Sequence, residues 1–237
     1  VPYSRINISG SVNILNQMVD SGVRSFIFSS TASVYGEPEY LPIDESHPLK
    51  PVNYYGFTKL LVENLSKWYS ELKGIRYAAL RYFNAVGYDS NQRILGIEKQ
   101  PTNLVPMIME VASGKQDLLE VYGNDYDTKD GTCIRDYIHV DDLASAHLSC
   151  LEYLKENKSV TFNCGYGHGY SVMEIIKVVK KVSGINFNVE ITDRRVGDAA
   201  VLLTDNSKIL KMTNWNPRYD DIEYICKTAL EWERKNI

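Results

Sequence analysis

Tyr55 and Lys59 are the two residues of this chain whose types and spacing best suit proton transfer. They stand four positions apart, and on a helix this spacing places both side chains on the same face. A tyrosine phenol has an ordinary pKa of about 10, and a nearby cation favours the phenolate, which can act as a general base. The pair therefore predicts a base, Tyr55, whose pKa the ammonium of Lys59 lowers.

Hydroxyl side chains follow the apolar segment that precedes this pair. Residues 26–30 are predicted to form a strand, and Ser29, Thr31 and Ser33 lie at or just beyond its end. Such hydroxyls could relay a proton to or from Tyr55. A tyrosine and a lysine at this spacing also occur on many ordinary surface helices, so the assignment depends on the elements around them.

Helices and strands alternate around the pair. In chain order we predict a helix over residues 8–21, a strand over 26–30, a helix that carries Tyr55 and Lys59, and a strand over 77–82. Gly22 and Gly74 end the two helices. Such alternation is typical of a parallel sheet with crossover helices. We therefore predict an α/β fold with a doubly wound parallel sheet in residues 1–86.

The alternation is lost from residue 87 onward. There we predict helices over residues 104–113, 141–154, 172–182 and 222–235, and short strands over 119–122 and 160–164. Ser171 and Glu174 have the spacing of a capping box at the start of the third of these helices. Residues 87–237 are therefore predicted to form a smaller α+β substrate domain, with some segments returning to the first domain.

Composition excludes several classes of protein. The 237 residues carry a formal net charge of -4, so there is no basic field to hold a nucleic acid. No apolar run approaches the ~20 residues of a transmembrane helix, and we expect no membrane partner and a cytoplasmic location. The four cysteines and four histidines lack the spacing of zinc ligands, so we expect free buried thiols and no metal.

Three further segments extend the pattern around Tyr55 and Lys59. They are SSTASVYG at residues 29–36, RYFNAVG at 81–87 and GNDYDTKDGTCIRDYIHVDDL at 123–143. With these segments the chain resembles the UDP-glucose 4-epimerases of the extended short-chain dehydrogenase/reductase family, from residue 7 to the last helix. The resemblance implies a Rossmann-type NAD-binding domain followed by a UDP-sugar-binding domain, in a cytoplasmic homodimer.

The resemblance also implies an activity, the interconversion of UDP-glucose and UDP-galactose in galactose metabolism. Tightly bound NAD would take a hydride from the sugar and return it to the opposite face of a transient 4-keto intermediate. Tyr55 would be the catalytic base, Lys59 would lower its pKa and bind the nicotinamide ribose, and Thr31 would supply the catalytic hydroxyl.

Other residues receive binding roles from the same resemblance. The surroundings of the nicotinamide and its ribose would include Asn7, Ser29, Tyr82 and Phe83. The UDP-sugar would be held by Asn84, Asn103, Leu104, Tyr122, Arg135, Val172, Arg195 and Asp198. These residue types suit the task, because guanidinium groups bind diphosphates and a carboxylate binds a ribose diol.

Two features depart from the pattern of that family. No glycine-rich turn for a pyrophosphate follows a first strand, so we expect a longer parent protein with about 60–90 further residues, at ~30 per βαβ unit. The isolated chain is then expected to lack NAD and activity. Leu202 stands where the family has tyrosine or a small residue next to the C2' substituent, which favours UDP-glucose and UDP-galactose as the substrates.

Three alternatives remain open. The chain could be a catalytically silent nucleotide-sugar-binding protein, or a 4-epimerase of another UDP-sugar with an N-acetylhexosamine, pentose or uronate. A nucleotide-sugar 4,6-dehydratase is disfavoured, because it needs an Asp-Glu pair after the strand hydroxyl, and here Ala32 and Ser33 follow Thr31.

Overall fold

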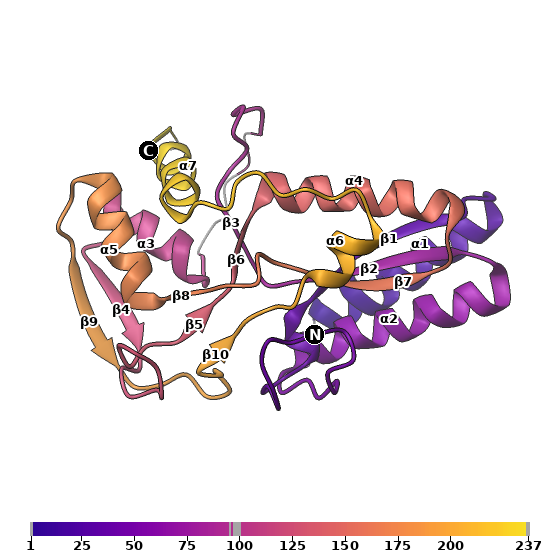
Figure 1. The fold of residues 1–237 in the computed structure, drawn as a ribbon, viewed down its shortest axis with the longest axis horizontal. Helices are drawn as coiled ribbons and strands as arrows, with labels where there is room; N and C mark the ends of the chain where they lie inside the picture. The colour runs from indigo at the N-terminus through magenta and orange to yellow at the C-terminus, as the bar shows by residue number, and fades with distance from the viewer. Residues whose placement is uncertain (1, 95, 97–100, 236–237) are drawn as a thin grey trace.

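A three-stranded parallel sheet in the order β1-β2-β7 forms the larger half of the molecule (Figure 1). The computed structural model describes residues 2–94, 96 and 101–235. The strands are β1 (Ser25–Thr31), β2 (Arg76–Tyr82) and β7 (Val160–Cys164). Their last residues, Thr31, Tyr82 and Cys164, are register partners. The three carboxyl ends therefore meet at one edge, and the predicted parallel α/β sheet is confirmed.

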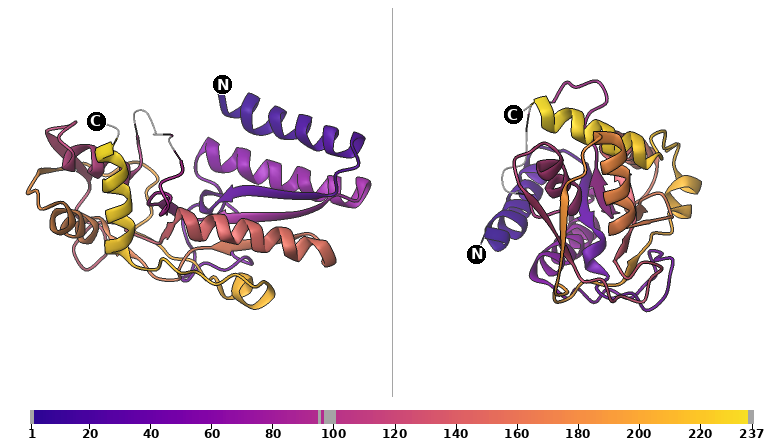
Figure 2. Two further views of the ribbon diagram at one scale, coloured as in Figure 1. Left: turned by 90° about the horizontal axis from the view of Figure 1, so that it is seen from above. Right: turned by 90° about the vertical axis from the view of Figure 1, so that its left-hand side faces the viewer.

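Helices cover both faces of this sheet (Figure 2). One face carries α1 (Gly10–Asp20) and α2 (Tyr54–Lys73), and the other carries α4 (Val140–Glu156). On the first face Val62 of α2 packs against Phe28 and Ala79. On the second face Cys150 of α4 packs in the cluster that contains Phe162 of β7. Alternate residues of the strands thus serve two cores, which accounts for their continuous apolar sequence.

A smaller half built from short strands and three helices lies beside the carboxyl edge of the sheet (Figure 1). Its helices are α3 (Leu104–Ala112), α5 (Val172–Ser183) and α7 (Ile222–Lys235). Its strands pair as β3 (Asn84–Val86) with β6 (Tyr137–His139), and β4 (Leu118–Tyr122) with β9 (Asn188–Thr192). A third sheet joins β10 (Val201–Leu202), β5 (Ile134–Arg135) and β8 (Tyr170–Ser171). Ile108, Ile175 and Ile225 bring the three helices into one core with Val121 of β4.

Side-chain and glycine caps end several helices where the sequence predicts. The hydroxyl of Ser171 accepts a hydrogen bond from the N–H of Glu174, whose carboxylate accepts one from the N–H of Ser171. The predicted capping box at the start of α5 is therefore confirmed. Gly74 ends α2 with a φ of 68°, a conformation that costs glycine little. No described helix is both long and apolar enough to span a membrane.

Two helical elements differ from the sequence-based prediction, and the pairing of one predicted strand is visible only in the structure. The first helix is preceded by a wider π-helical turn, η1 (Ser4–Ser9), and the regular α1 begins at Gly10. The strand predicted over residues 160–164 exists, but as β7 it pairs in parallel with β2 in the larger sheet. A short helix, α6 (Ser207–Met212), which the sequence did not indicate, packs near β7. The pairing partner of a strand lies far away in sequence, so no local pattern reveals it.

Candidate active site

Asn53 determines where α2 begins and so where Tyr55 lies. Asn53 is extended, and its side-chain Oδ1 accepts a 2.8 Å hydrogen bond from the backbone N–H of Gly56. A side-chain acceptor at this position satisfies one of the free N–H groups at a helix start. Tyr55 is therefore held in the first turn of a well-capped helix.

Gly56 allows this first turn to approach the end of β1. A Cβ atom at position 56 would lie 2.3 Å from the carbonyl oxygen of Ser33, in the 3-10 turn that follows Thr31. Only a residue without a Cβ permits so close a contact. In this arrangement Thr31 and Tyr55 line the same cavity, and the hydroxyl of Thr31 donates a 3.2 Å hydrogen bond to the Oγ of Ser33. The predicted base and the predicted catalytic hydroxyl are thus brought together.

Lys59 lies one turn further along α2 and points at the strand. Its Nζ donates a 2.9 Å hydrogen bond to the carbonyl oxygen of Ser29 and lies 5.7 Å from the centroid of the Tyr55 ring. Burial lowers the pKa of Lys59, because the loss of solvent disfavours the charged form. The ammonium is therefore held between the strand end and the ring of Tyr55.

Burial opposes the lowering of the Tyr55 pKa that the sequence predicts for nearby positive charges. Burial raises the pKa of Tyr55, the phenol of Tyr82 adds to the rise, the hydrogen bond from Thr31 opposes it, and Tyr3 raises it slightly. The loss of solvent around the phenol dominates because a buried phenolate is poorly stabilised. Tyr55 is therefore a neutral phenol at pH 7 in this structure, and Lys59 does not make it a base unaided.

Asn7 and Ser29, which the resemblance assigns to the cofactor, lie around this pair. The Nδ2 of Asn7 donates a 3.0 Å hydrogen bond to the hydroxyl of Thr58 on α2. The hydroxyl of Ser29 is 3.1 Å from the Nε2 of His147 on α4. Both side chains are thus fixed by neighbouring helices close to Lys59.

A cavity of about 810 Å³ opens at the carboxyl edge of the sheet. It is lined by every residue that the resemblance assigns to the substrate, and by two assigned to the cofactor. These are Thr31, Tyr55, Tyr82, Phe83, Asn84, Asn103, Leu104, Tyr122, Arg135, Val172, Arg195, Asp198 and Leu202. The tertiary structure thus brings these residues, which are far apart in the sequence, to one cavity. Asn7, Ser29 and Lys59 lie beside this cavity.

Two arginines supply the positively charged groups of this cavity, whose lining also includes the carboxylates of Glu120 and Asp198. Arg135 lies with its NH2 atom 3.8 Å from the Oδ1 of Asp198, and its NH1 atom donates to the carbonyl oxygen of Ile134. The guanidinium of Arg195 lies over the ring of Tyr122, 3.9 Å from its centroid. Planar guanidinium groups suit a diphosphate. Among the described residues, no group of three or more His, Cys, Asp or Glu side chains could hold a metal ion.

Several residues that line the cavity were missed from the sequence, and Tyr3 is the most informative of them. Its ring centroid lies 5.6 Å from that of Tyr55. The neighbouring Ser4 hydroxyl is 2.7 Å from the hydroxyl of Tyr54, which also lines the cavity. The four-residue spacing between Tyr3 and Asn7 was the only local signal that could have indicated its position.

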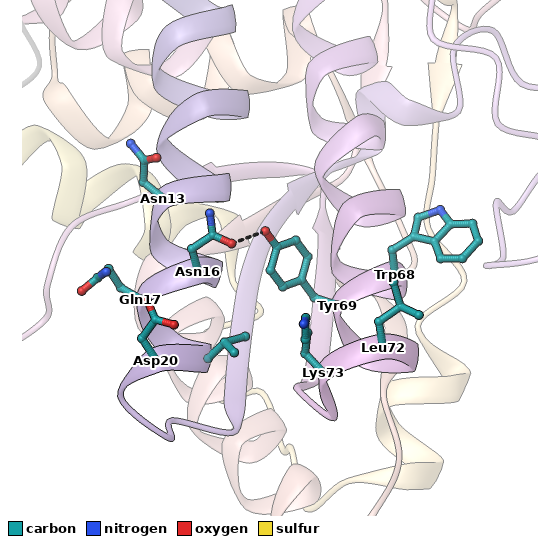
Figure 3. Close-up of a pocket in the computed structure, with 9 residues that line it drawn as sticks. Asn13, Asn16, Gln17, Asp20, Trp68, Tyr69, Leu72 and Lys73 are labelled. Atoms are coloured by element: carbon teal, nitrogen blue, oxygen red, sulfur yellow. Dashed lines mark hydrogen bonds between the residues drawn. The ribbon is translucent and has the colours of Figure 1, made fainter.

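A second, more open groove runs between α1 and α2 (Figure 3). It is lined by Asn13, Asn16, Gln17, Val19 and Asp20 of α1 and by Trp68, Tyr69, Leu72 and Lys73 of α2. The hydroxyl of Tyr69 donates a 2.6 Å hydrogen bond to the Oδ1 of Asn16 across it. Its volume of about 850 Å³ is similar to that of the first cavity, but it contains none of the predicted site residues.

Known proteins share this fold. A UDP-glucose 4-epimerase of Halalkalibacterium halodurans is 41% identical over 237 residues, which is all of this chain and 71% of that protein. The structure of the UDP-Glc/GlcNAc 4-epimerase of Campylobacter jejuni has 48% identity and a TM-score of 0.83, over 97% of this chain and 70% of that one.

A third relative was solved with bound ligands. The UDP-glucose-4-epimerase of Stenotrophomonas maltophila, with NAD and formylated UDP-arabinopyranose, matches with a TM-score of 0.94 and 39% identity, over 99% of this chain and 70% of that one. The model of the NAD dependent epimerase/dehydratase family matches residues 1–165. This match, together with the relative that is 41% identical over the whole chain, means that the chain belongs to the NAD dependent epimerase/dehydratase family.

Proposed function

We propose that this enzyme interconverts UDP-glucose and UDP-galactose through a transient 4-keto sugar, with NAD as its cofactor, as a step of galactose metabolism. One observation carries the proposal. A single cavity is lined both by Tyr55 and Thr31 and by the two arginines Arg135 and Arg195. A proton-transfer group and a diphosphate site in one space are what a nucleotide-sugar epimerase needs.

Tyr55 acts on the 4'-hydroxyl of the sugar in this mechanism. Oxidation of a secondary alcohol needs a base for the hydroxyl proton and a hydride acceptor on the opposite side of the carbon. NAD supplies the hydride acceptor when bound, and its positive charge favours the phenolate. Tyr55 takes the proton, directly or through the hydroxyl of Thr31, and returns it after the keto sugar has turned over. The sugar then carries the inverted configuration at C4'.

The residues near Tyr55 fit the nicotinamide end of NAD. The ammonium of Lys59 has three N–H donors, and its hydrogen bond to Ser29 uses one of them. In the described part of the chain no second acceptor is hydrogen-bonded to Lys59, so two donors can bind ribose hydroxyls. We propose that the nicotinamide and its ribose are held by Lys59 with Tyr55, Asn7, Ser29, Tyr82 and Phe83.

The residues on the far side of the cavity fit the UDP part. We propose that Arg135 and Arg195 bind the diphosphate and that Asp198 accepts from the uridine ribose. Asp198 forms a 3.8 Å ion pair with Arg135. When the ribose binds, the carboxylate of Asp198 would give up this ion pair and accept hydrogen bonds from the ribose hydroxyls. The uracil and the remaining sugar contacts would be made by Asn84, Asn103, Leu104, Tyr122 and Val172.

The breadth of the substrate range depends on Leu202, which lines the cavity. We propose UDP-glucose and UDP-galactose as the substrates, because leucine is neither a small residue nor a tyrosine at this position. Activity on an N-acetylated UDP-hexose is the alternative, and the Campylobacter jejuni relative is described as a UDP-Glc/GlcNAc 4-epimerase. UDP-pentoses and UDP-uronates are the other alternative substrates, and the same assay tests them.

An assay with UDP-galactose and added NAD tests the proposal. In protein to which NAD is bound, we expect conversion to a mixture of UDP-galactose and UDP-glucose, and without bound NAD we expect no turnover. Tyr55→Phe should lower turnover by about 10²–10⁴-fold, the usual contribution of a general base, with UDP affinity kept. Arg135→Ala should weaken UDP binding by about 1 kcal/mol or more, because a charge-assisted hydrogen bond is lost.

Two results would contradict this function. Full turnover in Tyr55→Phe would remove Tyr55 from the mechanism. Binding of UDP-sugars without any conversion, in protein to which NAD is bound, would support the alternative of a catalytically silent nucleotide-sugar-binding protein.

We also propose that the protein is a homodimer that associates through α1 and α2. Phe57, Trp68 and Leu72 lie on one stripe of α2 and are 49%, 59% and 69% exposed, and Ile14 of α1 is 54% exposed. Apolar side chains gathered on one face mark interaction surfaces. Trp68 and Leu72 border the groove between the helices (Figure 3), where a second copy could insert side chains.

Light scattering tests the dimer with a matched pair of variants. Leu72→Glu should shift the protein to a monomer, whereas Leu148→Glu on α4, where the side chain is 66% exposed, should leave the dimer intact. A wild-type protein that is monomeric would contradict the proposal. We further propose a cytoplasmic location, since all four cysteines are free and buried, as is usual in a reducing compartment.

A further inference from the structure

Arg194 and Arg195 leave the end of β9 in opposite directions. The paired strands β4 and β9 end at Tyr122 and Thr192, which are register partners. Beyond this point residues 193–195 have no regular secondary structure, and the two guanidinium groups lie over different rings. Arg195 lies over Tyr122 inside the cavity, whereas Arg194 lies over Tyr126 outside it.

Arg194 is tied to the loop after β4 by three contacts. Its guanidinium lies 4.1 Å from the centroid of the Tyr126 ring. Its Nε donates a 2.6 Å hydrogen bond to the Oδ1 of Asp125, and its NH2 donates to the backbone carbonyl of the same residue. Stacking and a forked hydrogen bond together restrict a guanidinium in both position and plane.

The loop that receives Arg194 is itself fixed. Tyr126 is 5% exposed, and its N–H donates a 2.9 Å hydrogen bond to the carbonyl of Gly131. Gly123 has a φ of 84°, and a Cβ there would lie 2.7 Å from both the Cγ of Arg194 and the ring of Tyr126. A glycine is therefore required for Arg194 to lie against this loop.

Arg195 has weaker attachments of its own. Its NH1 donates a 3.4 Å hydrogen bond to the carbonyl of Thr102, and its guanidinium stacks on Tyr122. The next residue, Val196, is fully exposed. Without Arg194 the segment that carries Arg195 would be free to move. Ligand binding would then have to order this segment, and the entropy lost would lower the affinity.

We propose that Arg194 is a positioning residue of the diphosphate site, which holds the backbone of Arg195 so that this second guanidinium faces the cavity. The inference rests on the proposed function of Arg195 as a diphosphate-binding residue. Arg194 itself does not line the cavity, so its effect on a ligand should pass through Arg195. Loss of Arg194 should therefore weaken the binding of ligands that carry a diphosphate and leave the binding of a nucleoside unchanged.

Calorimetric titration with UDP and with uridine tests this inference. Arg194→Ala should weaken UDP binding by about 3- to 10-fold, the size expected for an exposed cation–π contact and ion pair together. Uridine affinity should not change. In an Arg195→Ala background, the additional change Arg194→Ala should have no effect on UDP affinity.

Asp125→Asn separates positioning from simple electrostatics. This change makes the site more positive, so charge alone predicts tighter UDP binding, whereas loss of the anchor predicts weaker binding. Arg194→Lys keeps the charge without the planar fork and should bind UDP as weakly as Arg194→Ala. Thermal unfolding of each variant should match the wild type, because these side chains lie at the surface.

Three results would overturn the inference. They are unchanged UDP affinity in Arg194→Ala, an equal loss for uridine and UDP, and an undiminished loss in the Arg195→Ala background. A wild-type protein that binds neither uridine nor UDP would instead overturn the proposed function. The two failures are therefore distinguishable in one set of titrations.

Discussion

Replacing Glu63 by alanine should lower the free energy of unfolding by about 3–5 kcal/mol, because it leaves a buried arginine without its counter-charge. Glu63 and Arg81 are each 6% exposed. The carboxylate accepts 3.0 Å and 2.6 Å hydrogen bonds from the Nε and NH2 of Arg81 and another from the hydroxyl of Ser30. The NH1 of Arg81 donates to the hydroxyl of Tyr35. Ser30, which bonds to Glu63, immediately precedes Thr31, so the active-site turn should loosen as well.

Urea denaturation monitored by circular dichroism measures this loss. Glu152→Ala is the matched control, because its partner Lys155 is 62% exposed and a surface ion pair contributes about 0–1 kcal/mol. The double variant with Glu63→Leu and Arg81→Met should regain much of the stability, since both charges are then removed. A decrease in the free energy of unfolding below about 1 kcal/mol in Glu63→Ala would refute the reasoning, because it would mean that the guanidinium of Arg81 becomes solvated in the variant.

Three other predictions concern single positions. Gly56→Ala should abolish turnover and lower the melting temperature, because its Cβ would meet the carbonyl oxygen of Ser33 at 2.3 Å; an active, equally stable variant would contradict the close approach. Burial raises the pKa of Asp136 from 3.8 to about 6, so the folded state binds the proton more tightly. The protonated carboxyl of Asp136 therefore adds about 3 kcal/mol to the free energy of unfolding, at about 1.36 kcal/mol per pKa unit. This stabilisation is fully present below pH 3.8 and is lost as the pH rises to 6. Unfolding of wild type and Asp136→Asn compared at pH 4 and pH 7 should show that difference, and parallel pH profiles would refute it. Leu202→Ser should raise the activity on UDP-N-acetylglucosamine relative to UDP-glucose, and an unchanged ratio would show that another residue limits the C2' substituent.

Helix boundaries could be predicted because the signals that set them are local. The helix predicted over residues 222–235 is α7 as observed, since its apolar spacing lies within four turns. The helix predicted over residues 172–182 ends one residue later, at Ser183. Residues 8–21 were predicted as a single regular helix, and the π-helical turn at its start was missed. That turn depends on contacts with α2, such as the hydrogen bond of Asn7 to Thr58.

The effect of burial on the pKa of Tyr55 could not be predicted from the sequence. The spacing of Tyr55 and Lys59 places them on one helix face, but it does not reveal how much solvent each side chain loses. Burial at the sheet edge raises the pKa of the phenol and lowers that of the amine. Desolvation is a property of the whole environment, so a local pattern could not supply its sign.

The sequence by itself determined the longer helices, four of the strands, several caps and the residue types available for chemistry, because hydrophobic period and capping act over a few residues. It also carried the segments through which the chain resembles its family, and every residue that the resemblance assigns to the substrate lines the cavity. Only the tertiary structure decided that β7 pairs with β2, that Arg194 anchors Arg195 and that Tyr55 is a neutral phenol. Each of these depends on groups distant in sequence being close in space, where pairing, stacking and loss of solvent decide the energy.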